Sequence, residues 1–192
     1  SSTGASMVLI ESTAVNKHGK ITDADMCLYN NNHEKNLKKL IKFLKSKNNI
    51  KYGIQLSHAG RKGSSYVPWI KSNTPLPKNK SWKTFSASAI SRSRKWPKPQ
   101  QMTKLQIKKI IKNFKSSALR ANRIKFDCLE LHMAHGYLLH QFFSPISNKR
   151  TDEYGGSLKN RSRLLNEIAH EVRKVWPKNK ILGARITGTD HL

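Results

Sequence analysis

The sequence has 192 residues, enough for one domain of ordinary size or for a piece of a larger one. Hydrophobic residues at 36% and charged residues at 25% exclude a disordered tail, and no apolar run approaches the roughly 20 residues that cross a bilayer. The net charge of +26 suggests nucleic acid as a partner. The lysines, however, alternate with apolar residues as on solvated helix faces, and no nucleic-acid-binding motif is present. We therefore expect that nucleic-acid binding is not the main function.

Segments with strand and helix periodicity alternate along the chain. In chain order we predict a strand at 7–10, a helix at 33–47, a strand at 52–56, a helix from 103, a strand at 128–132, a helix at 161–176 and a strand at 181–187. The helix from Thr103 has Gln106 three residues on, which is a capping-box start. A polar stretch rich in Pro, Trp, Ser and Lys, at about 59–101, is predicted to be a long loop insertion. This alternation indicates βαβ units and a parallel sheet.

Side chains alternate along the predicted strands, so that one face of each strand is apolar and the other is small or polar. Gln55, His132 and Arg185 lie on the polar face of their strands, toward the carboxyl ends. On the first strand, Val8, Ile10 and Ser12 fit the same inward pattern. Alternate residues line the interior of a TIM barrel, and active sites lie at the carboxyl ends of its strands.

The main rival is a doubly wound open sheet, which also binds ligands at strand carboxyl ends but usually has a Gly-rich phosphate turn after its first strand. Residues 12–16, Ser-Thr-Ala-Val-Asn, are not such a turn. We therefore predict an α/β fold that is a partial TIM (β/α)8 barrel, with about four of the eight βα units present.

Two histidines and a tyrosine are concentrated after the third predicted strand. His132 and His135 cannot both face inward within one extended strand, because a step of three residues reverses the side-chain face. They can converge, together with Tyr137, if the strand ends at His132 and the chain turns at Gly136. A zinc site is one interpretation, but no third or fourth ligand with suitable spacing follows, so we predict no metal. The other interpretation is a hydrogen-bonded pair of core histidines without a functional role.

Three segments together resemble the old yellow enzyme family. They are Gly-Ile-Gln-Leu-Ser-His-Ala-Gly-Arg-Lys at 53–62, His-Met-Ala-His-Gly-Tyr at 132–137 and Phe-Ser-Pro-Ile-Ser-Asn-Lys-Arg-Thr-Asp-Glu-Tyr-Gly-Gly-Ser at 143–157. The resemblance runs in order from about residue 7 to residue 190. It is greatest to the bacterial NADPH dehydrogenase and xenobiotic reductase branch, which has His-x-x-His where the yeast-type branch has His-x-x-Asn.

The resemblance implies an FMN-dependent NAD(P)H oxidoreductase of the ene-reductase type. Such an enzyme reduces activated C=C bonds or nitro groups by hydride transfer from reduced flavin. For cofactor binding, it implies that Gln55 hydrogen-bonds the pyrimidine edge of FMN, that Arg185 lies beside flavin N1 and O2, and that Ser12 contacts the isoalloxazine.

For the substrate, the resemblance implies that His132 and His135 donate hydrogen bonds to a carbonyl or nitro oxygen, which stabilises the developing enolate. Tyr137 matches the proton donor to the α-carbon. One departure lies at Lys125, which stands where the family has a helix-ending glycine, in a conformation that lysine tolerates poorly.

The resemblance also implies that residues 1–192 form a single partial flavin-binding barrel domain, with the first and last strands missing. We read the chain as a fragment and expect it to be inactive alone, because the loops that hold the flavin phosphate follow the missing strands. The expected partner is then a small electrophilic alkene or nitro compound, and we expect no membrane association. Whether the full-length protein forms a homo-oligomer is left open.

Two alternative functions remain at this point. One is a flavoenzyme like dienoyl-CoA reductase or trimethylamine dehydrogenase, with an iron–sulfur cluster in the missing part; the other is a basic nucleic-acid-binding module. The two cysteines, Cys27 and Cys128, show neither metal nor redox spacing and suit a reducing compartment. With no visible secretory signal, we predict a cytoplasmic protein.

Overall fold

The computed structural model describes residues 4–190 and contains a four-stranded parallel sheet in the order β1-β2-β5-β6. The strands are β1 (Met7–Ala14), β2 (Lys51–Ser57), β5 (Cys128–Met133) and β6 (Ile181–Ile186). The strands that follow one another in the chain are neighbours in the sheet, and helices lie in each connection between them. The predicted βαβ arrangement and parallel sheet are therefore confirmed.

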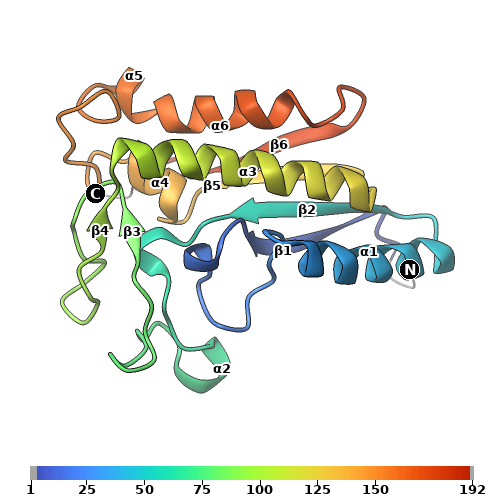
Figure 1. Cartoon of the computed structure of the whole chain (residues 1–192), viewed down its shortest axis with the longest axis horizontal. Helices are drawn as coiled ribbons and strands as arrows, with labels where there is room; N and C mark the ends of the chain where they lie inside the picture. Colours follow the sequence, from blue (N-terminus) through green and yellow to red (C-terminus); the bar gives the residue numbers. More distant parts are fainter. Residues whose placement is uncertain (1–3, 191–192) are drawn as a thin grey trace.

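Amphipathic helices cover one face of this sheet (Figure 1). They are α1 (Asn31–Lys47), α3 (Lys104–Ile124) and α6 (Arg163–Arg173). The four-residue α5 (Leu158–Arg161) precedes α6 and has no buried residue. The core lies between the two layers, where Ile54 and Leu129 of the sheet and Phe114 and Ile168 of the helices are completely buried. The predicted capping box at Thr103 is present: its hydroxyl accepts from the Gln106 N–H at 3.2 Å. No helix within residues 4–190 is long and apolar enough to cross a membrane.

The remaining elements gather at the carboxyl ends of the strands, on the left of Figure 1. They are η1 (Lys17–Gly19), η2 (Gly60–Lys62), α2 (Pro68–Lys71), β3 (Phe85–Ser86), β4 (Gln100–Gln101) and α4 (Leu138–Phe143). The predicted loop at 59–101 thus contains short helical and strand segments, and β3 pairs with β4 in a separate two-stranded sheet.

Two predicted elements differ from the structure. The predicted helix at 161–176 is broken at Ser162, which separates α5 from α6, and α6 ends at Arg173. Its end is set by a turn in which Trp176 leaves the helix so that its indole Nε1 donates to the Ile181 carbonyl at 3.0 Å. The predicted strand at 7–10 extends to Ala14, through a shift in register between Ile10 and Thr13.

This irregularity, the β1 bulge, corrects the predicted direction of Val8 and Ile10. Ile10 pairs with the core residue Ile54, so Val8 and Ile10 face the helices rather than the barrel interior. After the bulge, Ala14 pairs with Ser57. Ser12 therefore lies on the same face of the sheet as Gln55, as predicted. One extra residue reverses the alternation, and a period-two pattern cannot reveal it.

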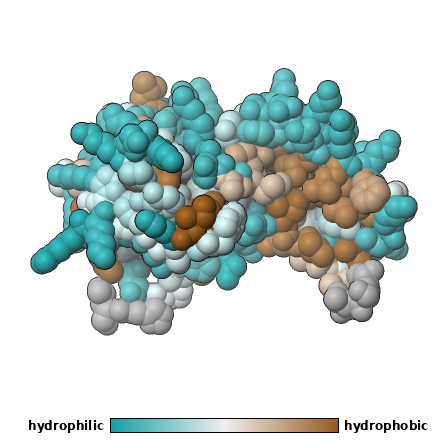
Figure 2. Space-filling model, turned by 90° about the horizontal axis from the view of Figure 1, so that it is seen from below, coloured by the Kyte–Doolittle hydropathy of each residue, from teal (hydrophilic) through white to brown (hydrophobic). Residues whose placement is uncertain are grey.

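The edge strands expose apolar side chains. Exposed large hydrophobic residues include Met7 and Leu9 on β1 and Ile181 and Ile186 on β6. Seen from below, apolar side chains form one contiguous area on the right of the view (Figure 2). Among the described strands, β1 and β6 stand at the two ends of the sheet. A closed barrel pairs such edge strands and covers the apolar side chains beside them.

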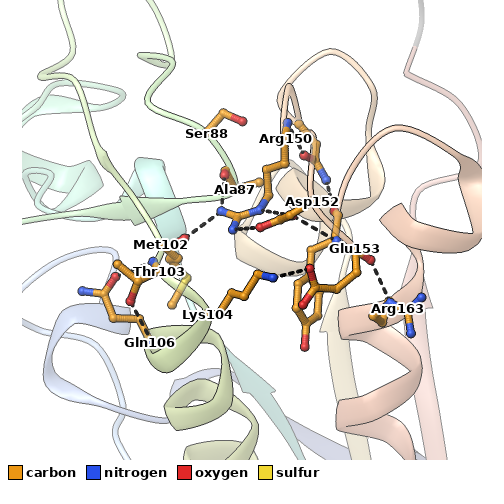
Figure 3. A network of polar contacts seen from close by, with 12 residues as sticks. Ala87, Ser88, Met102, Thr103, Lys104, Gln106, Arg150, Asp152, Glu153 and Arg163 are labelled. Carbon is orange, nitrogen blue, oxygen red and sulfur yellow. Dashed lines mark hydrogen bonds and ion pairs between the residues drawn. The ribbon is translucent and has the colours of Figure 1, made fainter.

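A buried arginine joins the β3–β4 region to the segment after α4 (Figure 3). The Arg150 guanidinium donates to the carbonyls of Ala87 at 3.0 Å and Met102 at 2.7 Å, and it forms a bidentate pair with the Asp152 carboxylate at 2.9 and 2.5 Å. The side chain of Arg150 is only 3% exposed. Hydrogen bonds from Arg150, the largest cause, hold the pKa of Asp152 below its ordinary value. The Asn-Lys-Arg-Thr-Asp motif therefore anchors this part of the fold.

Lys125 ends α3 in the left-handed conformation, with φ at 72°. We expect Lys125→Gly to raise the free energy of unfolding by about 0.5–1 kcal/mol, because glycine adopts this conformation without a Cβ penalty. Chemical denaturation of the two proteins measures the difference. Lys112→Gly, within the exposed face of the same helix, should instead destabilise by about 1 kcal/mol. Equal destabilisation by both changes would contradict the argument.

Candidate active site

His132, near the end of β5, has the properties of a neutral hydrogen-bond donor. It is 3% exposed, and its Nδ1 accepts from the Ala134 N–H at 3.3 Å, which leaves the ring proton on Nε2. Burial, followed by the charges of His135 and Arg185, lowers the pKa of His132 to about 4. The ring is therefore neutral near pH 7 and carries one N–H that no described residue accepts.

The chain turns after β5 and brings the second histidine and the tyrosine to His132. His135 and Gly136 both have positive φ, at 57° and 67°, so the turn places two successive residues in the left-handed region. The rings of His132 and His135 then lie 5.0 Å apart, and those of His132 and Tyr137 lie 4.9 Å apart, both edge to face. The three predicted side chains therefore meet, with Gly136 at the turn as predicted.

Three contacts that the sequence did not reveal hold this turn. The Gly136 N–H donates to His140 Nδ1 at 2.8 Å, and His140 Nε2 lies 2.9 Å from the Asp190 carboxylate. The Thr187 hydroxyl accepts from the His135 N–H at 3.0 Å. These contacts join the turn to the segment after β6. The residues of the His135–Thr187 and His140–Asp190 contacts are about fifty positions apart in the chain, so spacing gave no signal for these two contacts.

Lys62, at the end of η2, also approaches the turn. Its ammonium donates to the His135 carbonyl and lies 5.4 Å from the centre of the Tyr137 ring. Burial, followed by the charges of Arg92 and Arg61, lowers the pKa of Lys62 to about 8. Burial also raises the pKa of the Tyr137 phenol above its ordinary value, so that the phenol keeps its proton. Lys62 falls within the first of the three motifs, but nothing in its spacing indicated these contacts.

The register of the sheet places Gln55 and Arg185 on one face. Gln55 pairs with Glu130, which pairs with Gly183, two residues before Arg185; His132 pairs with Arg185 directly. Gln55 is buried and its Nε2 donates to the Glu130 carboxylate at 2.5 Å, whereas Arg185 is exposed. Gln55, Arg185 and His132 therefore share one face near the strand carboxyl ends, as the alternation predicted.

A cavity of about 390 Å³ lies next to the turn. Ser12, Lys62, Trp69, Arg92 and Tyr137 are among the residues that line it. Ser12 and Tyr137 thus reach one space, while Gln55, His132, His135 and Arg185 do not line it. The predicted residues form two groups, one around this cavity and one on the sheet face and the turn after β5, with Tyr137 and its contact to His132 between them.

The buried histidine makes the fold sensitive to acid. Between the ordinary pKa of 6.5 and the folded-state value of about 4, the unfolded chain binds a proton at His132 that the folded chain does not. Stability should therefore rise with pH across this window, by up to about 1.4 kcal/mol per pH unit for this one group. Denaturation at pH 4.5, 5.5 and 6.5 should give a shallower dependence for His132→Gln than for the parent protein. The exposed His170→Gln serves as the control, and an unchanged slope in His132→Gln would contradict the assignment.

Comparison with known proteins identifies relatives over the whole chain. A sequence model of the NADH:flavin oxidoreductase / NADH oxidase family matches residues 1–192. The chain is 39% identical to an NADPH dehydrogenase of Clostridium acetobutylicum over 190 residues, which cover 98% of this chain and 51% of that protein. It is 42% identical over 191 residues to an NADH:flavin oxidoreductase of Gibberella zeae, covering 97% and 46%. The chain spans about half the length of the curated relatives it matches.

Among solved structures, the chain is similar to morphinone reductase in complex with tetrahydroNAD. The TM-score is 0.81 at 23% sequence identity, over 94% of this chain and 50% of that one. This likeness shows the fold, and the predicted partial TIM barrel is confirmed: the four strands and their helices correspond to about half of a (β/α)8 barrel. The chain therefore belongs to the NADH:flavin oxidoreductase / NADH oxidase family, the old yellow enzyme family, whose cofactor is FMN and whose reductant is NADH or NADPH.

Proposed function

We propose that the protein containing this half-barrel is an ene-reductase that reduces activated alkenes or nitro compounds with electrons from NAD(P)H. The observation that carries this proposal is the neutral His132, whose free Nε2–H lies beside His135 and Tyr137 near the carboxyl end of β5. Such a group of donors suits an oxygen that becomes negative during the reaction. It does not require a metal.

The residues on the sheet face fit the ring of FMN. The pyrimidine edge of a flavin presents alternating donors and acceptors, which the Gln55 amide can match with its free Oε1 and second N–H. The exposed Arg185 supplies a fixed positive charge for the reduced, anionic ring. A Cβ built on Gly183 of the same face would meet nothing within 4 Å, so a flat ring has room there. The Ser57 hydroxyl is buried on this face and has no hydrogen-bond partner among residues 4–190.

When bound, FMN supplies the hydride that reduces the substrate. The chain's own residues would then do two things. His132, with His135, donates hydrogen bonds to the carbonyl or nitro oxygen and polarises the conjugated bond. Tyr137, protonated because burial raises its pKa, gives its phenolic proton to the α-carbon. Lys62 and the His140–Asp190 contact position the turn that carries both groups.

The full-length protein tests this proposal by its absorbance. We expect flavin bands that bleach on anaerobic addition of NADPH and return on addition of 2-cyclohexenone. His132→Ala should keep the bands and the bleaching, but re-oxidation by the enone should slow by about 10²-fold or more. Bleaching without any re-oxidation by enones or nitroalkenes would leave the flavin assignment intact and overturn the substrate class.

A further inference from the structure

Glu130 lies on β5, on the sheet face that carries the proposed flavin residues, and the proposed reaction gives it no task. It pairs directly with Gln55 of β2, and its carboxylate accepts from Gln55 Nε2 at 2.5 Å. Its cross-strand neighbour on the other side is Gly183, which brings no side chain to compete for the carboxylate. Within residues 4–190, Glu130 forms no ion pair. The side-chain hydrogen bond of Glu130 in this part of the chain is therefore made to a neutral amide.

This hydrogen bond fixes the orientation of the Gln55 amide. A carboxylate only accepts hydrogen bonds, an amide nitrogen only donates them, and an amide oxygen only accepts them. Turning the amide over would bring its Oε1 against the Glu130 oxygen, acceptor against acceptor, so one orientation is favoured. Gln55 is buried, and no described residue donates to its Oε1. The oxygen and the second N–H of the amide are therefore left for a ligand, in a fixed order.

We propose that Glu130 is a positioning residue for FMN, which acts by holding the Gln55 amide in the orientation that the flavin requires. The pyrimidine edge of the flavin ring presents an N–H next to a carbonyl oxygen, and an amide with its oxygen and one N–H free matches that pair. The reversed amide would set its own N–H group against the flavin N–H. The inference rests on the proposed contact between Gln55 and FMN, and it does not depend on the substrate class.

The orientation of the amide affects the affinity for FMN through the fraction of molecules that is ready to bind, because the apparent Kd is the intrinsic Kd divided by that fraction. In Glu130→Leu, the Gln55 side chain is free to choose between two amide orientations and among several rotamers. The ready fraction then falls to roughly a third to a tenth. In Glu130→Gln, the new amide can accept or donate, so the choice of orientation returns but the rotamer stays held. The ready fraction then falls only to about a half.

The test is the Kd of FMN for the full-length protein, measured by flavin fluorescence after equilibrium dialysis. We expect Glu130→Leu to raise this Kd about three- to tenfold and Glu130→Gln to raise it about twofold. Because Glu130→Gln keeps the size of the side chain, it tests the proposal even if Glu130→Leu does not fold. Glu153→Gln removes the same charge from the exposed pair with Lys104, and as the matched control it should leave the Kd unchanged.

The same changes in a Gln55→Leu background show whether Glu130 acts through the amide. We expect Gln55→Leu itself to weaken FMN binding, and Glu130→Leu to add nothing to that loss, because the amide that Glu130 holds is gone. An equal rise of the Kd in both backgrounds, or an unchanged Kd in both Glu130 variants, would overturn the proposal. An unchanged Kd in Gln55→Leu would overturn it together with the proposed flavin contact of Gln55. The ene-reductase assignment is tested separately, by re-oxidation of the flavin with enones.

Discussion

Replacing Tyr137 with Phe should slow reduction of an enone by about 10²–10⁴-fold and leave reduction of the flavin by NADPH nearly unchanged. Only the second half-reaction needs a proton at carbon. The phenol is protonated because burial raises its pKa, and it stands edge to face with His132 at 4.9 Å, so it is placed beside the group that would hold the substrate oxygen. Stopped-flow absorbance of the flavin measures each half-reaction separately.

Tyr66→Phe is the matched control, because Tyr66 lines the same cavity but does not contact the histidine pair in the structure. Its removal should change neither half-reaction by more than a few-fold. If Tyr137→Phe slowed both half-reactions equally, the phenol would be a structural residue of the turn rather than a proton donor. The Lys62 ammonium, 5.4 Å from the Tyr137 ring centre, should remain in place in this variant because Phe keeps the ring.

Arg150→Met should lower the free energy of unfolding by about 3–5 kcal/mol, a large fraction of the roughly 5–15 kcal/mol of a typical domain. The change keeps the length of the side chain but leaves the carbonyls of Ala87 and Met102 without their donor. It also leaves the Asp152 carboxylate unpaired. Urea denaturation followed by far-ultraviolet circular dichroism measures the loss.

The control for this change lies in the same network in Figure 3. Lys104 pairs with Glu153 at 2.7 Å, but the two side chains are 58% and 44% exposed, so Lys104→Gln should change the free energy of unfolding far less than Arg150→Met. A loss in Arg150→Met as small as that in Lys104→Gln would show that the β3–β4 region does not depend on the buried arginine.

The strands and the long helices could be predicted because their periodicity is local. Strand positions, the capping box at Thr103 and the common face of Gln55 and Arg185 all follow from residues a few positions apart. The short helix α4 could not be predicted in this way, since six residues give less than two turns of pattern. It is held instead by Gln141, whose side chain donates to the Ala59 carbonyl at 3.3 Å and to the Gly136 carbonyl at 2.6 Å.

The candidate site was predictable as a set of residues but not as an arrangement. The histidine pair and the tyrosine are visible in the sequence, and Gly136 indicates a turn. The partners that fix the turn, Lys62 and Asp190, come from segments 73 and about 50 residues distant, and only the closed tertiary structure brings them there. The protonation state of His132 could not be predicted either, because it depends on burial: a charge pattern cannot show that the pKa of His132 falls to about 4.

The β1 bulge has a consequence for how freely the barrel mouth can change. Before the bulge, Ile10 packs against the helices. After the bulge, the pairing of Ala14 with Ser57 fixes the strand register again, and the Thr13 hydroxyl donates to the Glu11 carbonyl at 2.9 Å. Ser12 lies between these two constraints and lines the cavity, so an exchange there alters the cavity wall without moving a core residue. Substitutions at position 12 should therefore cost only about 0.5 kcal/mol in stability. The wall of this cavity can therefore vary at position 12 with little loss of stability.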